Sequence, residues 1–233
     1  MEDFDINSLS AYLHLTPDQV KKMAERGKLP GRRIGGQWRF SQAEIHQWFE
    51  ERIGASDEKE LVEVEKVFEI QSQKQAVDDF HIPDLLNVNN VAMPLLAKTK
   101  PKVIAKVCEL AAASGTLWEP DKMADAIANR EKLHPTALES GVALLHPRRP
   151  MPNAMDEAFI ALGVTHSGIP FGGPRGCLTD IFFLIGSTDE AVHLRLLARL
   201  SRLIQMPETL DQIRAQTSPQ GVWDVIHAAD EEL

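Results

Sequence analysis

One histidine stands where a short apolar run ends and a cluster of positive charge begins. In the stretch SGVALLHPRRP, residues 140–150, the apolar side chains at 142–145 predict a short buried strand that delivers His146 to the edge of a sheet. Pro147 follows it, and Arg148 and Arg149 add two positive charges. Imidazole offers a nucleophilic lone pair near neutral pH, and clustered arginines attract anions. The stretch is therefore a candidate site for chemistry on an anionic group.

A second concentration of charge lies near the start of the chain, although the 233 residues carry a formal net charge of -9. Residues 1–53 contain eight basic and eight acidic residues, but seven of the basic ones lie between positions 19 and 40, with a single acidic residue among them. A compact basic patch on an acidic protein indicates a local anion-binding surface. The patch consists of Lys21, Lys22, Arg26, Lys28, Arg32, Arg33 and Arg39.

Two predicted helices would position the first part of this basic patch. Apolar residues at helical spacing predict one helix over residues 6–13. The capping box Thr16-Pro17-Asp18-Gln19 begins a second helix, which Gly27 ends. Gln19, Lys22 and Arg26 fall on its outward face, opposite an inward apolar stripe. A helix, a short turn and a second helix make a helix-turn-helix, whose second helix can enter the major groove of DNA.

A predicted hairpin would carry the arginines of the patch. Residues 32–34 and 37–40 are short extended runs joined by Gly35-Gly36, a two-residue turn signal. A second capping box, residues 41–44, then opens a helix that contains Ile45, Trp48 and Phe49. The hairpin would project as a wing beside the second helix.

The order helix, turn, helix, wing, helix resembles the excisionase and MerR-type winged helix-turn-helix family. The segment LSAYLHLTPDQVKKMAERGKLPGRRIGGQWRFSQAEIHQWF, residues 9–49, carries the resemblance. It implies a partner, double-stranded DNA, with most of the basic residues on phosphates and Gln19 on an adenine edge. The phosphate contacts would come from Lys21, Lys22, Arg26, Arg32, Arg33 and Arg39. The alternative is a small helical module with a solvated basic face.

Residues 54–80 form an acidic, glutamine-rich connector between residues 1–53 and residues 81–233, which we expect to be separate domains. Leu61, Val64 and Phe68 would lie on one face of a helix there. A polar linker without such a helix is the alternative. One helix-turn-helix reads only a few base pairs, so pairing through the connector or the second domain predicts a homodimer.

From residue 81 the pattern alternates between strands and helices, which predicts an α/β sandwich with a mostly central mixed sheet. Together with the small N-terminal winged helix-turn-helix, this is the expected fold class. Strands are expected at 90–97, 140–146, 157–165 and 178–186, and helices at 102–114, 121–129, 190–204 and 207–216.

This second region resembles the enzyme IIA domains of the sugar phosphotransferase system, of the fructose/mannitol and nitrogen-regulatory type. The segments NREKLHPTALESGVALLHPR, residues 129–148, and GVTHSGIPFGGPRGCLTDIFFLIGSTDEAVHLRLLARLSRLI, residues 163–204, carry the resemblance, which extends over about 85–230. It implies that His146 is the phosphoryl acceptor, that His193 is its active-site neighbour and that Arg130 stabilises the phosphate. The implied phosphate donor is the histidine-containing phosphocarrier protein.

The segment departs from the family at the acceptor. Proline-histidine-glycine is usual there, whereas this chain has Leu145, His146 and Pro147. Pro147 removes a backbone N–H next to the acceptor and restricts His146 to an extended conformation. Two interpretations follow: a working acceptor, or a degenerate domain kept for ligand sensing or dimerisation.

Other signals are weaker. Cys108 and Cys177 lie far apart without CxxC spacing, which indicates neither a disulfide framework nor a cysteine zinc site. His134 and His166 lack HxxxH or HExxH spacing with the other histidines, so no metal and no cofactor are expected. No apolar run approaches the roughly 18 residues of a membrane span and no signal peptide is visible, so a cytoplasmic protein without a membrane partner is expected.

The sequence thus favours a transcriptional regulator, in which a winged helix-turn-helix is controlled by an enzyme IIA-like domain that senses the state of the phosphotransferase system through His146. The rival hypothesis is a phosphohistidine carrier that passes phosphate on to a transporter. DNA binding separates the two.

Overall fold

The computed structural model divides the chain into two compact units, Met1–Ala76 and Val77–Leu233. We describe each unit by itself. The predicted connector, with its apolar seam at Leu61, Val64 and Phe68, lies outside the described residues. The structure describes residues 3–13, 15–41, 44–45, 48, 81–206 and 208–233.

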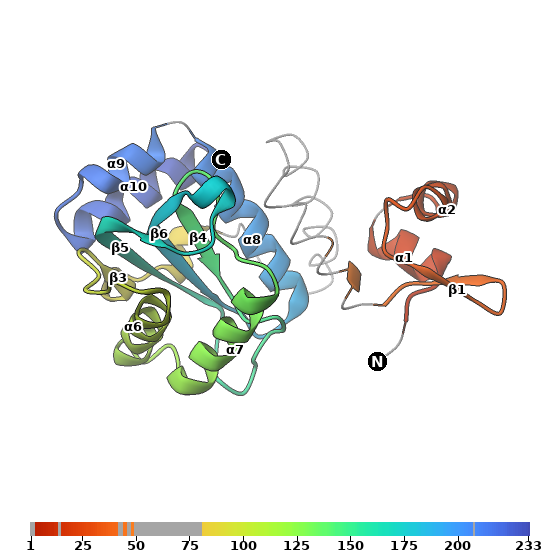
Figure 1. Ribbon diagram of the computed structural model, residues 1–233, viewed down its shortest axis with the longest axis horizontal. Helices are drawn as coiled ribbons and strands as arrows, with labels where there is room; N and C mark the ends of the chain where they lie inside the picture. The colour runs from red at the N-terminus through yellow and green to blue at the C-terminus, as the bar shows by residue number, and fades with distance from the viewer. Residues whose placement is uncertain (1–2, 14, 42–43, 46–47, 49–80, 207) are drawn as a thin grey trace. The chain divides into compact units, whose positions relative to one another are not determined.

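The first unit begins with the two predicted helices, α1 (Ile6–Tyr12) and α2 (Pro17–Glu25) (Figure 1). The predicted capping box starts α2: the Thr16 hydroxyl accepts from the Gln19 N–H at 3.3 Å, and the Gln19 side chain accepts from the Thr16 N–H at 2.8 Å. The two bonds join the N-cap residue to the first turn of the helix, where N–H groups lack i−4 partners. Val20 and Ala24 are buried, as their place on the inward stripe predicts.

The wing is a hairpin of β1 (Arg32–Ile34) and β2 (Gln37–Arg39), paired antiparallel. Gly35 and Gly36 have φ of 59° and 80°, a left-handed conformation at both turn positions that other residues rarely adopt. The predicted third helix is described only at residues 44, 45 and 48, which are helical. The described part of this unit therefore has the expected helix-turn-helix with a wing.

The second unit is built on a four-stranded sheet in the order β3-β5-β6-β4. Its strands are β3 (Val91–Ala92), β4 (Val142–Leu145), β5 (Phe159–Pro170) and β6 (Leu178–Gly186). The β3–β5 and β4–β6 pairs are parallel, whereas β5 and β6 are antiparallel. This mixed central sheet confirms the predicted fold class.

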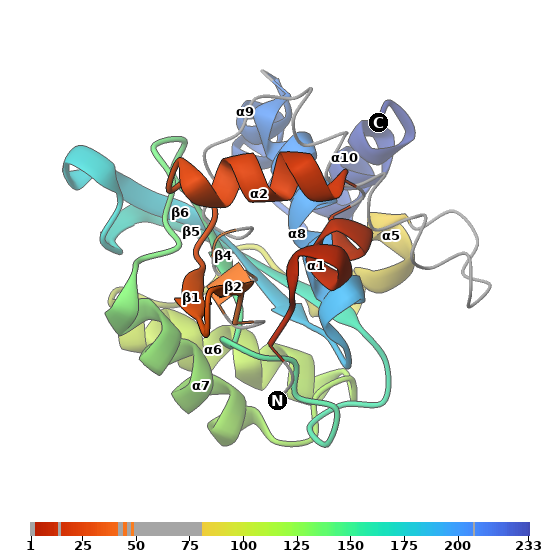
Figure 2. The same cartoon turned by 90° about the vertical axis from the view of Figure 1, so that its right-hand side faces the viewer.

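Helices cover both faces of the sheet. Figures 1 and 2 show α6 and α7 on one side and α8, α9 and α10 on the other. All four residues of β4 are buried, which explains why the strand reads as a continuous apolar run rather than an alternating one. The helices are α5 (Ile82–Leu85), α6 (Lys100–Ala113), α7 (Pro120–Leu133), α8 (Glu190–Gln205), α9 (Thr209–Ala215) and α10 (Pro219–Glu231), with short 3-10 turns η1 (Val88–Asn90) and η2 (Pro174–Gly176).

Most of the predicted elements are present, with three corrections. The strand expected over 90–97 is only the two residues of β3, because Pro94 has no N–H with which to continue the ladder. The strand expected over 157–165 extends to Pro170 across a register shift between Val164 and Ile169. Helices α5 and α10 had no predicted counterpart, and at the start of α10 the residues Pro219 and Gly221 read as a loop.

Candidate functional site

His146 follows the last residue of β4, and the alternation of that strand determines which face it occupies. Ala143 and Leu145 pack into the core cluster that includes residues of α6 and α7. Since alternate side chains point to opposite faces of a sheet, Leu144 and His146 are directed to the face covered by α8. The His146 side chain is almost entirely buried, with 3% of the residue exposed.

A backbone contact selects the tautomer of the His146 ring. Its Nδ1 lies 2.8 Å from the carbonyl oxygen of Leu144. A carbonyl oxygen can only accept a hydrogen bond, so Nδ1 carries the proton. In a neutral ring the other nitrogen, Nε2, then carries the lone pair. The local fold therefore selects Nε2 as the nucleophilic atom.

His193 comes from the first turn of α8 and meets His146. The helix begins where the Asp189 carboxylate accepts a hydrogen bond from the Val192 N–H at 2.9 Å. The two imidazole rings lie 5.1 Å apart between centroids, inclined at 58°. His193 is also buried, with 4% exposed. The structure thus brings together the two histidines that the sequence singled out from positions 47 residues apart.

Arg130 lies in the last turn of α7 and is buried. Its Nη1 donates to the carbonyl oxygen of His134 at 2.7 Å, across the end of the helix. This bond satisfies a carbonyl group at the helix end, where intrahelical partners run out. Arg130 therefore fixes the start of the segment that leads from α7 to β4 and His146.

A buried ion pair next to Arg130 holds the same segment, and sequence reasoning missed it. The Glu131 side chain is 1% exposed and accepts from Lys100 Nζ at 2.6 Å. It also accepts from the backbone N–H of Thr136 at 3.1 Å and from the Thr136 hydroxyl. The sequence did carry a signal, because Glu131 continues the i, i+4 spacing of the buried Met123 and Ile127. A carboxylate on an apolar helix face indicates a buried, paired charge.

Beyond these contacts the segment folds along the free side of β4. Ala137 forms an isolated antiparallel bridge with Ala143, and the Leu138 N–H donates to the Val142 carbonyl at 2.8 Å. The loop before the strand is thereby fixed to the strand itself.

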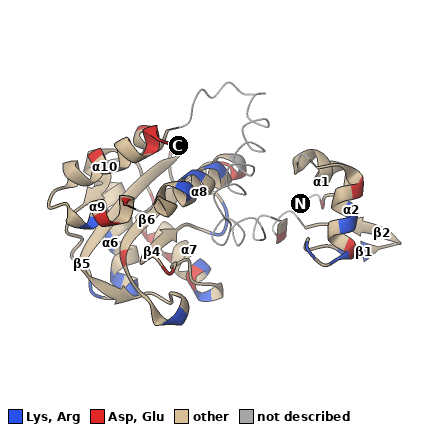
Figure 3. Ribbon diagram, turned by 90° about the horizontal axis from the view of Figure 1, so that it is seen from above, with Lys and Arg blue, Asp and Glu red and all other residues tan. Residues whose placement is uncertain are grey.

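The predicted DNA-contacting residues lie on α2 and the wing. Lys21, Lys22 and Arg26 are exposed on α2, and Figure 3 shows basic residues on both elements. The wing arginines already contact acidic side chains of the same unit: Arg32 lies 3.3 Å from Asp3, Arg33 lies 3.8 Å from Glu25, and Arg39 lies 4.0 Å from Asp5. The guanidinium of Arg33 also lies 5.1 Å from the centre of the Trp38 ring.

The Gln19 side chain has two competing assignments. Its Oε1 accepts from the Thr16 N–H at 2.8 Å and from the Thr16 hydroxyl at 3.0 Å. Paired contact with an adenine edge needs both the oxygen and the nitrogen of the amide. The capping box and this base contact therefore use the same oxygen atom.

The described residues contain neither a metal-binding cluster nor a membrane-spanning helix. No group of three or more His, Cys, Asp or Glu side chains there could hold a metal ion. In the same residues no helix is long and apolar enough to cross a bilayer. Cys108 and Cys177 are free thiols, and burial raises the pKa of Cys108 to about 12.

Family comparison decides the identity of the second unit. The model described as "Phosphoenolpyruvate-dependent sugar phosphotransferase system, EIIA 2" matches residues 84–229. The chain belongs to the EIIA 2 family. A second model, "Helix-turn-helix domain", matches residues 4–53, so a helix-turn-helix domain precedes the EIIA 2 domain.

The relatives of the chain include two proteins with assigned names. The "PTS system fructose-specific EIIABC component" of Bacillus subtilis is 26% identical over 151 residues, which cover 64% of this chain and 23% of that protein. The "Nitrogen regulatory protein" of Bradyrhizobium diazoefficiens is 28% identical over 149 residues, which cover 62% of this chain and 94% of that protein. The chain therefore spans less than a quarter of the first relative and nearly all of the second.

Solved structures show the same fold as the EIIA 2 domain. The nitrogen regulatory protein IIA-Ntr of Neisseria meningitidis aligns with a TM-score of 0.56 at 20% identity, covering 62% of this chain and 98% of that one. The IIA mannitol of Escherichia coli aligns with a TM-score of 0.54 at 20% identity, covering 60% and 97%. At this identity the likeness establishes the fold alone.

We predict that the Glu131 ion pair is required for the stability of the EIIA 2 domain. Glu131→Ala leaves Lys100 and Thr136 without their buried acceptor, so the free energy of unfolding should fall by about 3 kcal/mol or more. Lys132→Ala, at the adjacent exposed position, should change it by less than about 0.5 kcal/mol. Urea denaturation followed by circular dichroism measures both, and equal effects of the two substitutions would refute the prediction.

Proposed function

We propose that this protein is a DNA-binding transcriptional regulator whose EIIA 2 domain accepts a phosphoryl group on His146. The observation that carries the proposal is the bond from His146 Nδ1 to the Leu144 carbonyl, because it leaves the lone pair on Nε2 of a ring whose centre lies 5.1 Å from the centre of the His193 ring. The helix-turn-helix domain at 4–53 supports the DNA-binding half of the proposal.

The proposed transfer requires an opening that exposes His146 Nε2, which is buried in this structure. The exposed Nε2 then attacks the phosphorus of a phosphohistidine on the histidine-containing phosphocarrier protein. The new N–P bond forms as the donor's N–P bond breaks, and the bonding pair returns to the donor nitrogen. The proton stays on His146 Nδ1, which donates to the Leu144 carbonyl throughout, so the phosphorylated ring is a cation. His193 would donate a ring N–H to the phosphoryl oxygens, a charge-assisted bond.

Arg130 would supply positive charge to the phosphorylated state. A guanidinium has five N–H donors in a fixed fork, and one of them is committed to the His134 carbonyl. Arg148 and Arg149, exposed after Pro147, would attract the negatively charged phosphoryl group that the phosphocarrier protein carries.

The rival function is a phosphohistidine carrier without a role at DNA. Its support is one structural relative, the "Complex of enzyme IIAMTL and phosphorylated enzyme IIBMTL from Escherichia coli", which aligns over 62% of this chain with a TM-score of 0.53 at 19% identity. In that function the phosphoryl group leaves His146 for a second protein. If the phosphoryl group instead stays on His146 when DNA is present, and the phosphorylated protein binds DNA with a different affinity, the regulator is favoured.

We predict that phosphoenolpyruvate, enzyme I and the phosphocarrier protein together add one acid-labile phosphate to the purified chain, measured by intact mass. His146→Ala should abolish the addition. His193→Ala should slow it about 10- to 150-fold, because one charge-assisted hydrogen bond of about 1.5 to 3 kcal/mol is lost. His227→Ala, on α10, is the matched control and should behave as the wild type.

If no phosphate appears on His146 with excess donor, the acceptor proposal fails and the domain is a degenerate sensor. If phosphate appears, the affinity for DNA should change by about 5- to 150-fold, the usual range of allosteric coupling.

We predict that the full chain binds duplex DNA and that the binding weakens steeply with salt. Arg33→Ala and Arg39→Ala should each weaken binding to all sequences alike and reduce the salt slope by about 1. Lys122→Ala removes an exposed charge of the EIIA 2 domain and is the control, which should bind DNA as the wild type does. Fluorescence anisotropy on the DNA upstream of the protein's own gene and on an unrelated duplex measures these effects, and the absence of any binding at low salt would overturn the regulator proposal.

Gln19 is tested by a pair of variants in the same assay. Gln19→Glu keeps an acceptor for the Thr16 N–H but lacks the amide donor that adenine N7 requires. Gln19→Ala loses both. Loss of one base preference in both variants supports Gln19 as a base reader, whereas a preference retained in Gln19→Glu assigns the side chain to the cap alone.

We also propose that the regulator is a homodimer, because one helix-turn-helix domain covers a single half-site. Sedimentation equilibrium at micromolar concentration should give twice the chain mass. Leu61→Glu with Phe68→Glu should shift the equilibrium to monomer if the connector supplies the interface. A monomer under all conditions, with and without DNA, contradicts the proposal.

A further inference from the structure

The EIIA 2 domain contains a pocket at the opposite end of its sheet from the histidine pair. It has a volume of about 670 Å³, which lies in the range of small-molecule sites. Leu145, just before His146, pairs with Leu184, which pairs in turn with Ala161 of β5. The pocket begins at Thr165, about 13 Å further along β5. It is therefore separate from the site of the proposed phosphoryl transfer.

An irregularity in β5 creates this pocket. The pairing with β6 shifts between Val164 and Ile169, so the residues between them leave the regular ladder. The Thr165 hydroxyl donates to the Ser167 carbonyl at 3.0 Å and holds the displaced backbone. Gly168 lies against Leu178, where an added Cβ would approach the Leu178 Cβ to 2.6 Å. Bulges of this kind redirect side chains and often adjoin functional sites. We call this cavity the β5-bulge pocket.

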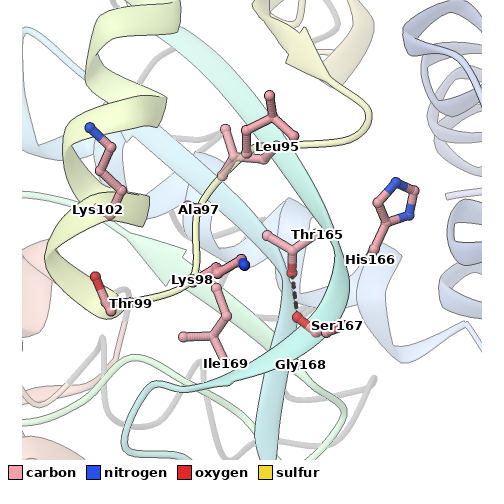
Figure 4. A pocket seen from close by; sticks show the side chains of 11 residues that line it. Leu95, Ala97, Lys98, Thr99, Lys102, Thr165, His166, Ser167, Gly168 and Ile169 are labelled. Carbon is pink, nitrogen blue, oxygen red and sulfur yellow. Dashed lines mark hydrogen bonds between the residues drawn. The ribbon is translucent and has the colours of Figure 1, made fainter.

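The other wall of the β5-bulge pocket is the loop from Leu95 to Thr99 with the first turn of α6 (Figure 4). Leu95 and Ile169 are buried and give the pocket an apolar floor. Leu96 is 77% exposed, an unusual position for a large apolar side chain at the rim of a cavity. This lining suits a ligand with an apolar body.

Positive charge adjoins the apolar floor. Figure 4 shows the Lys98 ammonium between the loop and β5, on the side of Thr165, whereas the His166 ring lies on the outer side of the strand. Lys102 lies at the rim, in the first turn of α6. The neighbouring Lys100 and Lys106 pair with Glu131 and Glu109, whereas no ion pair of Lys98 or Lys102 is found among the described residues. In Figure 4 the Lys102 ammonium points away from Thr165 and Ile169, so Lys98 is the cation directed at the pocket.

We propose that the β5-bulge pocket binds a small organic anion, with its apolar body against Leu95, Leu96 and Ile169 and its phosphate or carboxylate group at Lys98. An ammonium next to an anion gains a charge-assisted bond, while the apolar body removes the exposed surface of Leu96 from water. Such a ligand would give the EIIA 2 domain a second input, at a place that phosphorylation of His146 does not use.

The test is a titration of the ¹⁵N-labelled full chain, followed by the amide resonances. Phenyl phosphate is the main probe, because it joins an apolar ring to a phosphate group. Phenylacetate replaces the phosphate by a carboxylate, while inorganic phosphate lacks the ring and phenol lacks the charge. We expect phenyl phosphate or phenylacetate to give saturable shifts at residues 95–99 and 165–169, and the comparison of the two selects the head group. Inorganic phosphate and phenol should each bind at least about tenfold more weakly, since each lacks one of the two contacts.

Variants assign the effect to the pocket. Lys98→Gln should raise the dissociation constant about tenfold or more by removing the charged partner of the anion. Lys122→Gln, which removes an equally exposed charge on α7, should leave it unchanged. His146→Ala should also leave the dissociation constant unchanged. The ligand proposal and the phosphorylation proposal can therefore each fail without the other.

Three outcomes would overturn the proposal. The first is the absence of saturable shifts at these residues with either organic anion. The second is an unchanged dissociation constant in Lys98→Gln. The third is a set of shifts centred on residues 144–149 and 189–193, which would place the anion at the histidine pair instead.

Discussion

Strand β4 is buried on both faces, so each of its side chains has to fit a particular place in the packed interior. Its four residues pair in parallel with β6, from Val142 opposite Ile181 to Leu145 opposite Leu184. A slip by one residue would move every side chain to the other face. The position of His146 follows from this constraint, because the alternation that directs Leu145 toward α6 and α7 directs the next residue toward α8. The tautomer of His146 follows as well, since the Leu144 carbonyl is fixed by the same pairing.

The contact between His146 and His193 also depends on the position of α8. Buried charged side chains between α8 and α10 hold that helix in place. Asp230 of α10 is buried and accepts from Arg199 Nε at 2.6 Å, while His81 Nδ1 lies 2.9 Å from its other oxygen. Arg202 donates to the Leu233 carbonyl at 2.6 Å. These contacts tie the helix that carries His193 to the beginning and the end of the EIIA 2 domain. Breaking a buried ion pair leaves an uncompensated charge, so the arrangement favours one position of the helix.

The sequence was informative wherever a local pattern determines structure. The apolar run of β6, the amphipathic α8, the Thr16 capping box and the Gly35-Gly36 turn are all where their residues predict. For the site, the resemblance selected His146 and His193, and the structure places their rings together. The use of Arg130 at the His134 carbonyl could not be predicted, because it depends on where α7 ends.

The features that were missed depend on contacts between distant segments. Glu131 meets Lys100 only because α6 and α7 pack side by side, and spacing alone does not reveal that partner. The irregularity of β5 depends on Leu178 of the neighbouring strand, which leaves no room for a side chain at position 168. The hydrogen bonds between Gln19 and Thr16 were predicted from the sequence as a capping box. The structure adds that they use Gln19 Oε1, the same atom that a paired contact with adenine would need.

The segment between α7 and β4 has one more consequence. In the order β3-β5-β6-β4, strand β4 lies at the border of the sheet, and a border strand offers unpaired N–H and carbonyl groups to other polypeptide chains. The bridge from Ala137 to Ala143 and the bond from Leu138 to Val142 occupy that border. The Arg130 and Glu131 contacts that hold this segment therefore also protect the protein from aggregating strand to strand, and loosening them would endanger solubility as well as the geometry around His146.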